Sequence, residues 1–260
     1  MTVLLTNDDG FDSEGIKTLK EVFSTRHEVW IMAPVKNHSG ASCCLSITNR
    51  IEVFKKGKNE YALLGTPVDC VLNALTSNVF PHRPDVVLSG INSDSNLGTD
   101  VLYSGTCGAA RQASSFGVPG IALSIRNDYS GKTSQNYASL ANFALENLDR
   151  LVSLCQEKYP PEEGGHYKYY LNINAPVTGP YRGVRFATLS KRHYGDTVRV
   201  LNESDERLFI DARYVGEQVK SLGDGTEDSA AVDNGMIAIS MLYTEPQCYY
   251  GGGTWQDRTH

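Results

Sequence analysis

Short apolar segments alternate with helix-forming segments through the first half of the chain, and this alternation limits the possible folds more than any other feature. The strand-like segments are residues 2–6, 28–33, 85–88 and 121–125. The segments with helical periodicity or many small residues are 14–24, 66–79, 105–116 and 137–157. Apolar strands that alternate with helices form a mostly parallel sheet covered by helices on both faces. The sequence therefore predicts an α/β fold.

The second half is richer in strands. A hairpin is expected at residues 51–54 and 61–64, and later strands are expected at 169–173, 184–189, 198–201, 208–214 and 236–239. Polar, turn-rich connections are expected at 157–166 and 221–228. We predict one domain over residues 1–260, with a core at about 1–160, a β-rich C-terminal extension at about 167–245 and a flexible, glycine-containing tail at 249–260.

Charge and composition exclude several classes of protein. The net charge is −6 and the basic residues are scattered, so a long nucleic acid is not an expected partner. Small phosphorylated ligands need only a local site and are not excluded. The six cysteines form no Cys-x-x-Cys pair, and neither a signal peptide nor a membrane-spanning run is visible. We expect a cytoplasmic protein with free thiols and no membrane partner.

Two adjacent carboxylates follow the first predicted strand, in Thr6-Asn7-Asp8-Asp9-Gly10. Ligands of open parallel sheets bind outside the carboxyl ends of the strands. At about 5 Å and an effective dielectric constant near 20, the two charges would repel by roughly 3 kcal/mol. A divalent cation reverses that effect. The segment predicts either a metal site or a simple turn, because Asn, Asp and Gly also favour turns.

Three further polar segments lie where they can reach the same edge of the sheet. Asn92 and Asn96 follow the strand at 85–88 and offer amide groups to a metal or a phosphate, unless they belong to an ordinary surface loop. Ser104 and Thr106 open a helix whose end suits phosphate, although an ordinary N-cap is the alternative. Ser39 lies in the polar loop after the second strand. A hydroxyl there is a weaker candidate ligand.

The histidines argue against zinc. The six histidines show no His-x-x-x-His spacing or comparable pattern of metal ligands. Oxygen donors from Asp, Asn and Ser suit Mg²⁺ or Mn²⁺ better. The residues therefore favour one of these hard cations.

Taken together, the polar segments resemble the SurE family of survival-protein nucleotidases. The matching pieces are residues 4–10, 33–34, 39–42, 65–71, 89–92, 96–98 and 103–106. Their order and spacing also match, and this similarity covers roughly residues 2–125. Weaker similarity is seen at residues 172–176 and 235–240.

The resemblance implies a Rossmann-like core and metal-dependent hydrolysis of nucleoside 5′- or 3′-monophosphates. It implies one Mg²⁺ or Mn²⁺ per subunit, held by Asp8, Asp9, Ser39 and Asn92. It places around the phosphate the residues Asn96, Ser104, Gly105 and Thr106. It also implies a homodimer or homotetramer, built partly by exchanged elements of the C-terminal extension.

Three departures from the family pattern bear on activity. Asp94 stands where the family usually has Gly, and its carboxylate would strengthen the metal site or repel the phosphate. Cys43 and Cys44 replace small polar residues in the Ser39 loop. The aromatic stretch expected around residues 208–214 is altered, which affects the expected substrate preference.

We hypothesise a 5′-nucleotidase with the catalytic residues Asp8, Asp9 and Asn96. The cation polarises a phosphate oxygen and orients the attacking water, and Asp8 or Asp9 is the candidate general base. Nucleoside monophosphates are the expected substrates, and short polyphosphates are a further candidate class.

Three alternatives to this hypothesis stay open. In one, Asp8 attacks phosphorus itself and forms an aspartyl-phosphate. In the second, the protein binds nucleotides without turnover, which Asp94 motivates. A dinucleotide-dependent oxidoreductase is disfavoured, because no Gly-x-Gly-x-x-Gly follows the first strand.

Overall fold

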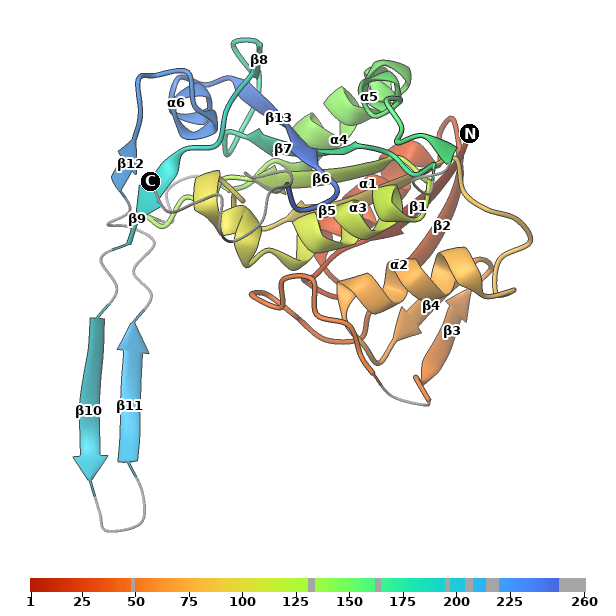
Figure 1. The fold of residues 1–260 in the computed structure, drawn as a ribbon, viewed down its shortest axis with the longest axis horizontal. Helices are drawn as coiled ribbons and strands as arrows, with labels where there is room; N and C mark the ends of the chain where they lie inside the picture. The colour runs from red at the N-terminus through yellow and green to blue at the C-terminus, as the bar shows by residue number, and fades with distance from the viewer. Residues whose placement is uncertain are drawn as a thin grey trace, which may run out of the picture.

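A nine-stranded, mostly parallel sheet forms the centre of the protein (Figure 1). The computed structural model describes residues 1–47, 50–130, 134–161, 165–194, 197–203, 208–213 and 220–247. The strand order is β3-β4-β2-β1-β5-β6-β7-β13-β8. The predicted α/β class is confirmed.

The middle of the sheet contains a reversal in strand order. The buried strand β1 (Thr2–Thr6) pairs in parallel with β2 (Glu28–Pro34) on one side and with β5 (Val86–Asn92) on the other. After β2 the chain adds β4 (Glu60–Leu63) and β3 (Val53–Gly57) outward, whereas β6 (Gly120–Ile125) extends the opposite side beyond β5. Such a switch point leaves a crevice at the carboxyl ends of the two central strands.

Helices cover both faces of the sheet. One face carries α1 (Glu14–Phe23), α4 (Tyr137–Glu146) and α5 (Leu148–Leu154), and the other carries α2 (Pro67–Thr76) and α3 (Gly105–Ser115). These helices form because their apolar residues recur every three or four positions and so gather on the face turned to the sheet.

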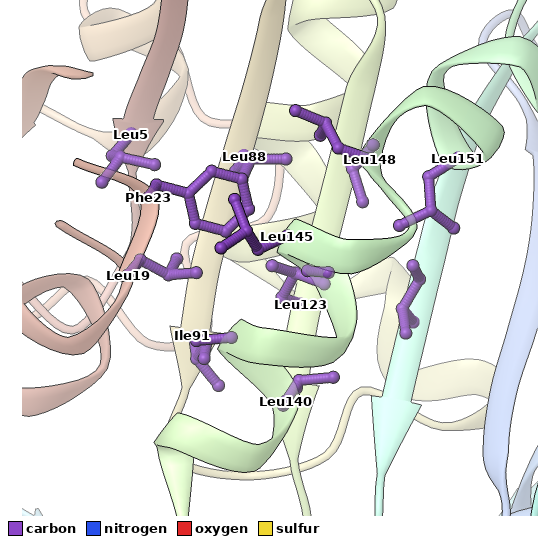
Figure 2. Close-up of a cluster of buried hydrophobic side chains, with 14 of the residues drawn as sticks. Leu5, Leu19, Phe23, Leu88, Ile91, Leu123, Leu140, Leu145, Leu148 and Leu151 are labelled. Atoms are coloured by element: carbon purple, nitrogen blue, oxygen red, sulfur yellow. The ribbon is translucent and has the colours of Figure 1, made fainter. Parts of the chain in front are cut away.

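The two faces of β1 show how the core is divided. Successive side chains of a strand point to opposite faces. Leu5 accordingly joins the cluster beneath α1, α4 and α5, whereas Leu4 packs in the cluster beneath α2 and α3. Figure 2 shows Leu5 close to Phe23 and Leu88 in the first cluster. Burial on both faces fixes β1, and with it the position of the residues that follow.

Two departures from the sequence prediction in the first half have a clear physical cause. The predicted helix at 137–157 is two helices, because Asn147 leaves helical geometry (φ −109°, ψ 10°) while its side-chain amide donates to the Phe143 carbonyl. The strand predicted at 85–88 does not end before Gly90 but continues to Asn92. Gly90 has φ +138°, and a Cβ there would lie 2.2 Å from the Leu123 carbonyl oxygen, so glycine permits an irregular strand rather than ending it.

The second half completes the sheet and adds a projection. β7 (Tyr169–Ala175) pairs with the antiparallel β13 (Ile237–Tyr243), which pairs with the edge strand β8 (Val184–Phe186). β10 (Thr197–Glu203) and β11 (Leu208–Arg213) form a separate antiparallel ribbon that extends away from the sheet (Figure 1). We call this pair the C-terminal ribbon.

Several short elements of the chain were not predicted. They are the 3₁₀ turn η1 (Gly98–Leu102), β9 (Lys191–His193), β12 (Lys220–Leu222) and α6 (Asp228–Asp233). They are too short to show a period in the sequence. The predicted tail at 249–260 and the end of the predicted strand 208–214 lie outside the described residues. In the part of the chain that is described, no helix has the length and apolarity needed to cross a membrane.

Candidate active site

The residues after β1 form a tight turn at the switch point. The Asn7 side chain donates to the Gly10 carbonyl at 2.8 Å and to the Ser13 hydroxyl at 2.7 Å, and it accepts from the Gly10 N–H at 3.1 Å. Gly10 has φ +106°, which favours glycine. The turn and the metal-site alternatives are therefore compatible, because Asn7 and Gly10 make the turn while Asp8 and Asp9 remain for chemistry.

Asp8 is buried against the start of α3. Its two carboxylate oxygens accept from the Thr106 hydroxyl at 2.6 Å and from the Thr106 backbone N–H at 3.1 Å. A Cβ at Gly105 would lie 2.9 Å from the Asp8 Cβ, so this close approach requires glycine. Burial raises the pKa of Asp8, the Thr106 hydroxyl lowers it, and the charge of Asp9 raises it further. The protein thus holds this carboxylate firmly but in a place that disfavours its charge.

Asp9 is held in a similar way by the loop after β5. Its oxygens accept from the Ser93 backbone N–H at 3.1 Å and from the Ser93 hydroxyl at 3.2 Å. Burial raises the pKa of Asp9, the two bonds from Ser93 lower it, and the charge of Asp94 raises it. Each carboxylate therefore has its own hydroxyl and N–H partner, one from α3 and one from the β5 loop.

Asn92 is the last residue of β5 and is mostly buried. Its side-chain N–H donates to the Asp94 carbonyl at 2.7 Å. Because the amide nitrogen is committed to this bond, its direction fixes the side-chain oxygen as the group available to a cation. Asn92 lies one residue before Ser93, which bonds Asp9 directly.

The loop that carries Ser39 is attached to the same site by its backbone. The His38 N–H donates to the Asp8 carbonyl at 2.7 Å, which places Ser39 one residue from a direct contact with the turn. Ser39 itself is exposed, and its N–H donates to the Asn37 side chain at 2.7 Å. Further along, the Ser42 N–H donates to the Tyr103 carbonyl at 2.9 Å. The loop therefore spans the distance between the Asp8 turn and α3.

The predicted phosphate-binding residues lie at the start of α3 and beside β7. Ser104 is the N-cap of α3 and accepts from the Cys107 N–H at 3.0 Å, a bond that is compatible with both an ordinary N-cap and a phosphate-binding helix end. Thr106 binds Asp8 directly. Asn96 is buried, donates to the Ser124 hydroxyl at 2.9 Å and is held through its backbone by Asn174. Contact of these residues with phosphate stays a prediction.

Four contacts at the site were not predicted from the sequence. Ser93 holds Asp9, Asn174 holds Asn96, the Tyr129 hydroxyl donates to the Asp94 carboxylate, and Gln135 donates to the Ser93 carbonyl. These residues come from segments far apart in the chain, so spacing gives no signal for them. Asn174 lies in the weaker similarity at residues 172–176, and Ser93 directly follows the motif at residues 89–92.

The donor groups fit a hard divalent cation. Among the described residues, no three His, Cys, Asp or Glu side chains gather as a metal-binding group. The predicted donors are instead two carboxylates, one amide oxygen and one hydroxyl, from Asp8, Asp9, Asn92 and Ser39. Oxygen sets of this kind suit Mg²⁺ or Mn²⁺, which retain several waters. Burial first, and a neighbouring carboxylate after it, raises the pKa of both Asp8 and Asp9, and a bound cation would favour their ionised forms.

Comparison with known proteins gives a consistent result. The sequence matches the model of a family described as "Survival protein SurE" over residues 3–196. A protein named 5′-nucleotidase SurE from Anaeromyxobacter sp. (strain Fw109-5) is 34% identical over 245 residues, covering 94% of this chain and 91% of that protein. A protein of the same name from Aeromonas hydrophila is 33% identical over 268 residues, covering 99% of each. A crystal structure of the SurE protein from Aquifex aeolicus superimposes with a TM-score of 0.76 at 29% identity, covering 96% of both chains.

Proposed function

This chain belongs to the SurE family, and from that premise we propose that it is a 5′-nucleotidase that hydrolyses nucleoside monophosphates to nucleoside and phosphate. The observation that carries the proposal is the pair of anchored carboxylates at the switch point. Asp8 is fixed by Thr106 at the start of α3, and Asp9 is fixed by Ser93 after β5. Ligands of open α/β sheets bind at this position.

We propose that one Mg²⁺ or Mn²⁺ is held by Asp8, Asp9, Asn92 and Ser39. When bound, such a cation supplies Lewis-acid chemistry and favours the ionised form of a nearby water. The residues of the protein do the rest of the positioning. Thr106 and Ser93 fix the two carboxylates, and the bond from Asn92 to the Asp94 carbonyl fixes the direction of the Asn92 oxygen.

The start of α3 is the proposed phosphate subsite. Helix N-termini carry unpaired N–H groups and a partial positive charge, which suit phosphate oxygens. Ser104, Gly105 and Thr106 lie at this end, and the last two are close to Asp8. Preorganised donors of this kind stabilise charge that develops on the phosphate oxygens in the transition state. Asn96 is the proposed additional donor.

Asp9 is the better candidate for general base. Both carboxylates have raised pKa values, but Asp8 is buried whereas Asp9 is partly accessible. A water beside Asp9 can therefore transfer its proton to the Asp9 carboxylate. An aspartyl-phosphate on Asp8 is the alternative, and burial of Asp8 against Thr106 disfavours it.

Three finer points belong to the proposal. Nucleoside 3′-monophosphates are proposed as further substrates, and short polyphosphates as a candidate class. The protein is proposed to act in the cytoplasm. It is also proposed to be a homodimer or homotetramer, with the C-terminal ribbon as a contact element.

Phosphate release from a panel of 5′- and 3′-nucleoside monophosphates, measured with Mg²⁺, Mn²⁺ or EDTA, tests the function. Metal-dependent release that EDTA abolishes and that Asp8→Asn lacks is the expected result. If a covalent phospho-enzyme can be trapped, the mechanism is attack of Asp8 on phosphorus rather than attack of water. Nucleotide binding without release under any metal would favour a binding protein, with Asp94 as the residue to revert to Gly.

A further inference from the structure

Gln135 lies outside every sequence motif, between β6 and α4, yet it contacts the candidate active site. Its side-chain nitrogen donates to the Ser93 carbonyl at 2.6 Å. The same nitrogen lies 3.3 Å from the Arg126 carbonyl oxygen and 3.4 Å from that of Ile125. Its side-chain oxygen accepts from the Tyr137 hydroxyl at 2.8 Å. Both ends of this amide are therefore occupied and its orientation is fixed.

The acceptor of the shortest of these bonds belongs to the residue that holds Asp9. Ser93 donates to Asp9 from its N–H at 3.1 Å and from its hydroxyl at 3.2 Å. Its carbonyl, on the other side of the same Cα, receives the bond from Gln135. Fixing that carbonyl restricts rotation of the Ser93 backbone, and this rotation would turn the two donors away from Asp9.

We propose that Gln135 is a positioning residue for the metal site, which acts on Asp9 through Ser93 without touching cation or substrate. The inference rests on the proposed function, because it takes Asp9 as a metal ligand. Asp9 needs such support, since the neighbouring carboxylates Asp8 and Asp94 both carry like charge. Outer-shell partners of metal ligands contribute about 10- to 100-fold to metal affinity.

Replacement of Gln135 by Met tests the proposal. Gln135→Met keeps a side chain of similar length, adds no charge and removes the amide group. We expect the Kd for Mn²⁺, measured by calorimetry without nucleotide, to rise by about tenfold. At saturating Mn²⁺, kcat should return close to the wild-type value, because Gln135 does not touch the substrate.

Asn136→Ala is the matched control. Asn136 is the next residue, is exposed, and caps α4 by accepting from the Ser139 N–H at 3.2 Å. This variant should lower the unfolding temperature and leave the Kd for Mn²⁺ unchanged. A Gln135→Met protein that is less stable but binds Mn²⁺ as tightly as wild type would reduce Gln135 to a structural residue and overturn the inference.

A second variant covers the case in which Gln135→Met does not fold. Tyr137→Phe removes only the hydroxyl that orients Gln135, and it should raise the Kd for Mn²⁺ by a smaller factor. An unchanged Kd in a folded Tyr137→Phe protein would then count against the inference. If the wild-type protein itself binds no Mn²⁺, the proposed function fails. If the wild-type protein and both variants bind Mn²⁺ equally tightly, only the role of Gln135 is overturned.

Discussion

Asp8 and Asp9 differ in how far each can be changed without harm to the fold. Asp8 accepts from the Thr106 N–H and hydroxyl but is buried, so an asparagine that turns its amide nitrogen toward that N–H would leave two donors face to face without water, whereas Asp9 is partly accessible. Asp9 accepts from the Ser93 N–H and the Ser93 hydroxyl, and a hydroxyl can rotate to accept instead of donate. Asn at position 9 can therefore keep both bonds to Ser93. Position 9 is the cleaner place to separate charge from structure.

Asp9→Asn should abolish metal binding and yet stabilise the metal-free protein at neutral pH. The folded pKa of Asp9 is raised above its ordinary 3.8, so ionised Asp9 destabilises the fold, and this cost grows as the pH rises from about 4 through the folded pKa. We expect a higher unfolding temperature than wild type at pH 7 in EDTA, and no such difference at pH below about 4.

Metal addition provides the second half of this test. At a cation concentration of 100 Kd, wild type should gain about 2.7 kcal/mol and Asp9→Asn should gain almost nothing. Activity should fall more than about 100-fold, beyond the loss typical of an outer-shell partner. Metal-dependent stabilisation that survives in Asp9→Asn would remove Asp9 from the ligand set.

Asp94→Asn should shift the pH dependence of activity. The charge of Asp94 raises the pKa of Asp9, so its removal lowers that pKa. If ionised Asp9 is required, activity is lost as the pH falls through the Asp9 pKa, and this acid limb should move to lower pH in the variant. A profile of kcat/KM against pH at saturating metal measures the shift. Movement of the limb to higher pH would contradict the assignment.

At the scale of elements, α2 connects the Ser39 loop to the core. Thr66 and Asp69 form a capping box at its start, with Thr66 accepting from the Asp69 N–H at 3.1 Å. The same two side chains hold the far end of the loop, since the Thr66 hydroxyl donates to the Cys44 carbonyl and the Asp69 carboxylate accepts from Ser46. The cap of α2 thus also restrains the segment that carries Ser39.

Thr66→Val should therefore weaken both the helix and the metal site. Loss of the cap should lower the free energy of unfolding by about 1 kcal/mol. Loss of the bond to Cys44 should loosen the loop and raise the Kd for Mn²⁺, measured by calorimetry. Thr76→Val is the matched control, because its hydroxyl bonds the Leu72 carbonyl at the other end of α2. Equal Mn²⁺ affinity in all three proteins would show that the loop does not depend on this cap.

Local patterns in the sequence predicted where helices and strands lie, but they did not predict the irregularities within those elements. The apolar run at 2–6 and the period of 14–24 give β1 and α1 almost to the residue, since burial on both faces or on one face leaves a direct signature. Gly90 and Asn147 were misjudged for a physical reason. Whether Gly ends a strand or Asn interrupts a helix depends on the packed neighbours, here the Leu123 and Phe143 carbonyls.

At the scale of the whole molecule, the strand order brings the site residues together. The motif positions of Asp8 and Asn92 were predicted from the sequence, but their proximity depends on β1 lying beside β5, which is a pairing between distant segments. The residues that support them, such as Ser93 and Gln135, depend on the same pairing. Short motifs therefore predicted candidate ligands, and only the fold could identify what holds them.

The C-terminal ribbon is a separate two-stranded sheet with an exposed apolar surface. An isolated two-stranded ribbon is at best marginally stable in water. Val200 and Ile210 lie directly opposite each other in its register, and their side chains are 59% and 56% exposed. Directly opposed residues share one face of a ribbon, so these two form an apolar surface together with the nearby Val198. Contact with another subunit would bury that surface.

Replacement of both Val200 and Ile210 by Glu should reduce the mass of the assembly in solution. A dimer should become a monomer, or a tetramer should become a dimer. Two charges on the apolar face would have to be desolvated in any contact that buries it, whereas a free ribbon leaves them in water. Arg199→Glu is the control, because Arg199 is exposed on the opposite face of the same strand. Sedimentation or light scattering measures the mass. An unchanged mass for the double variant would mean that the subunits associate elsewhere.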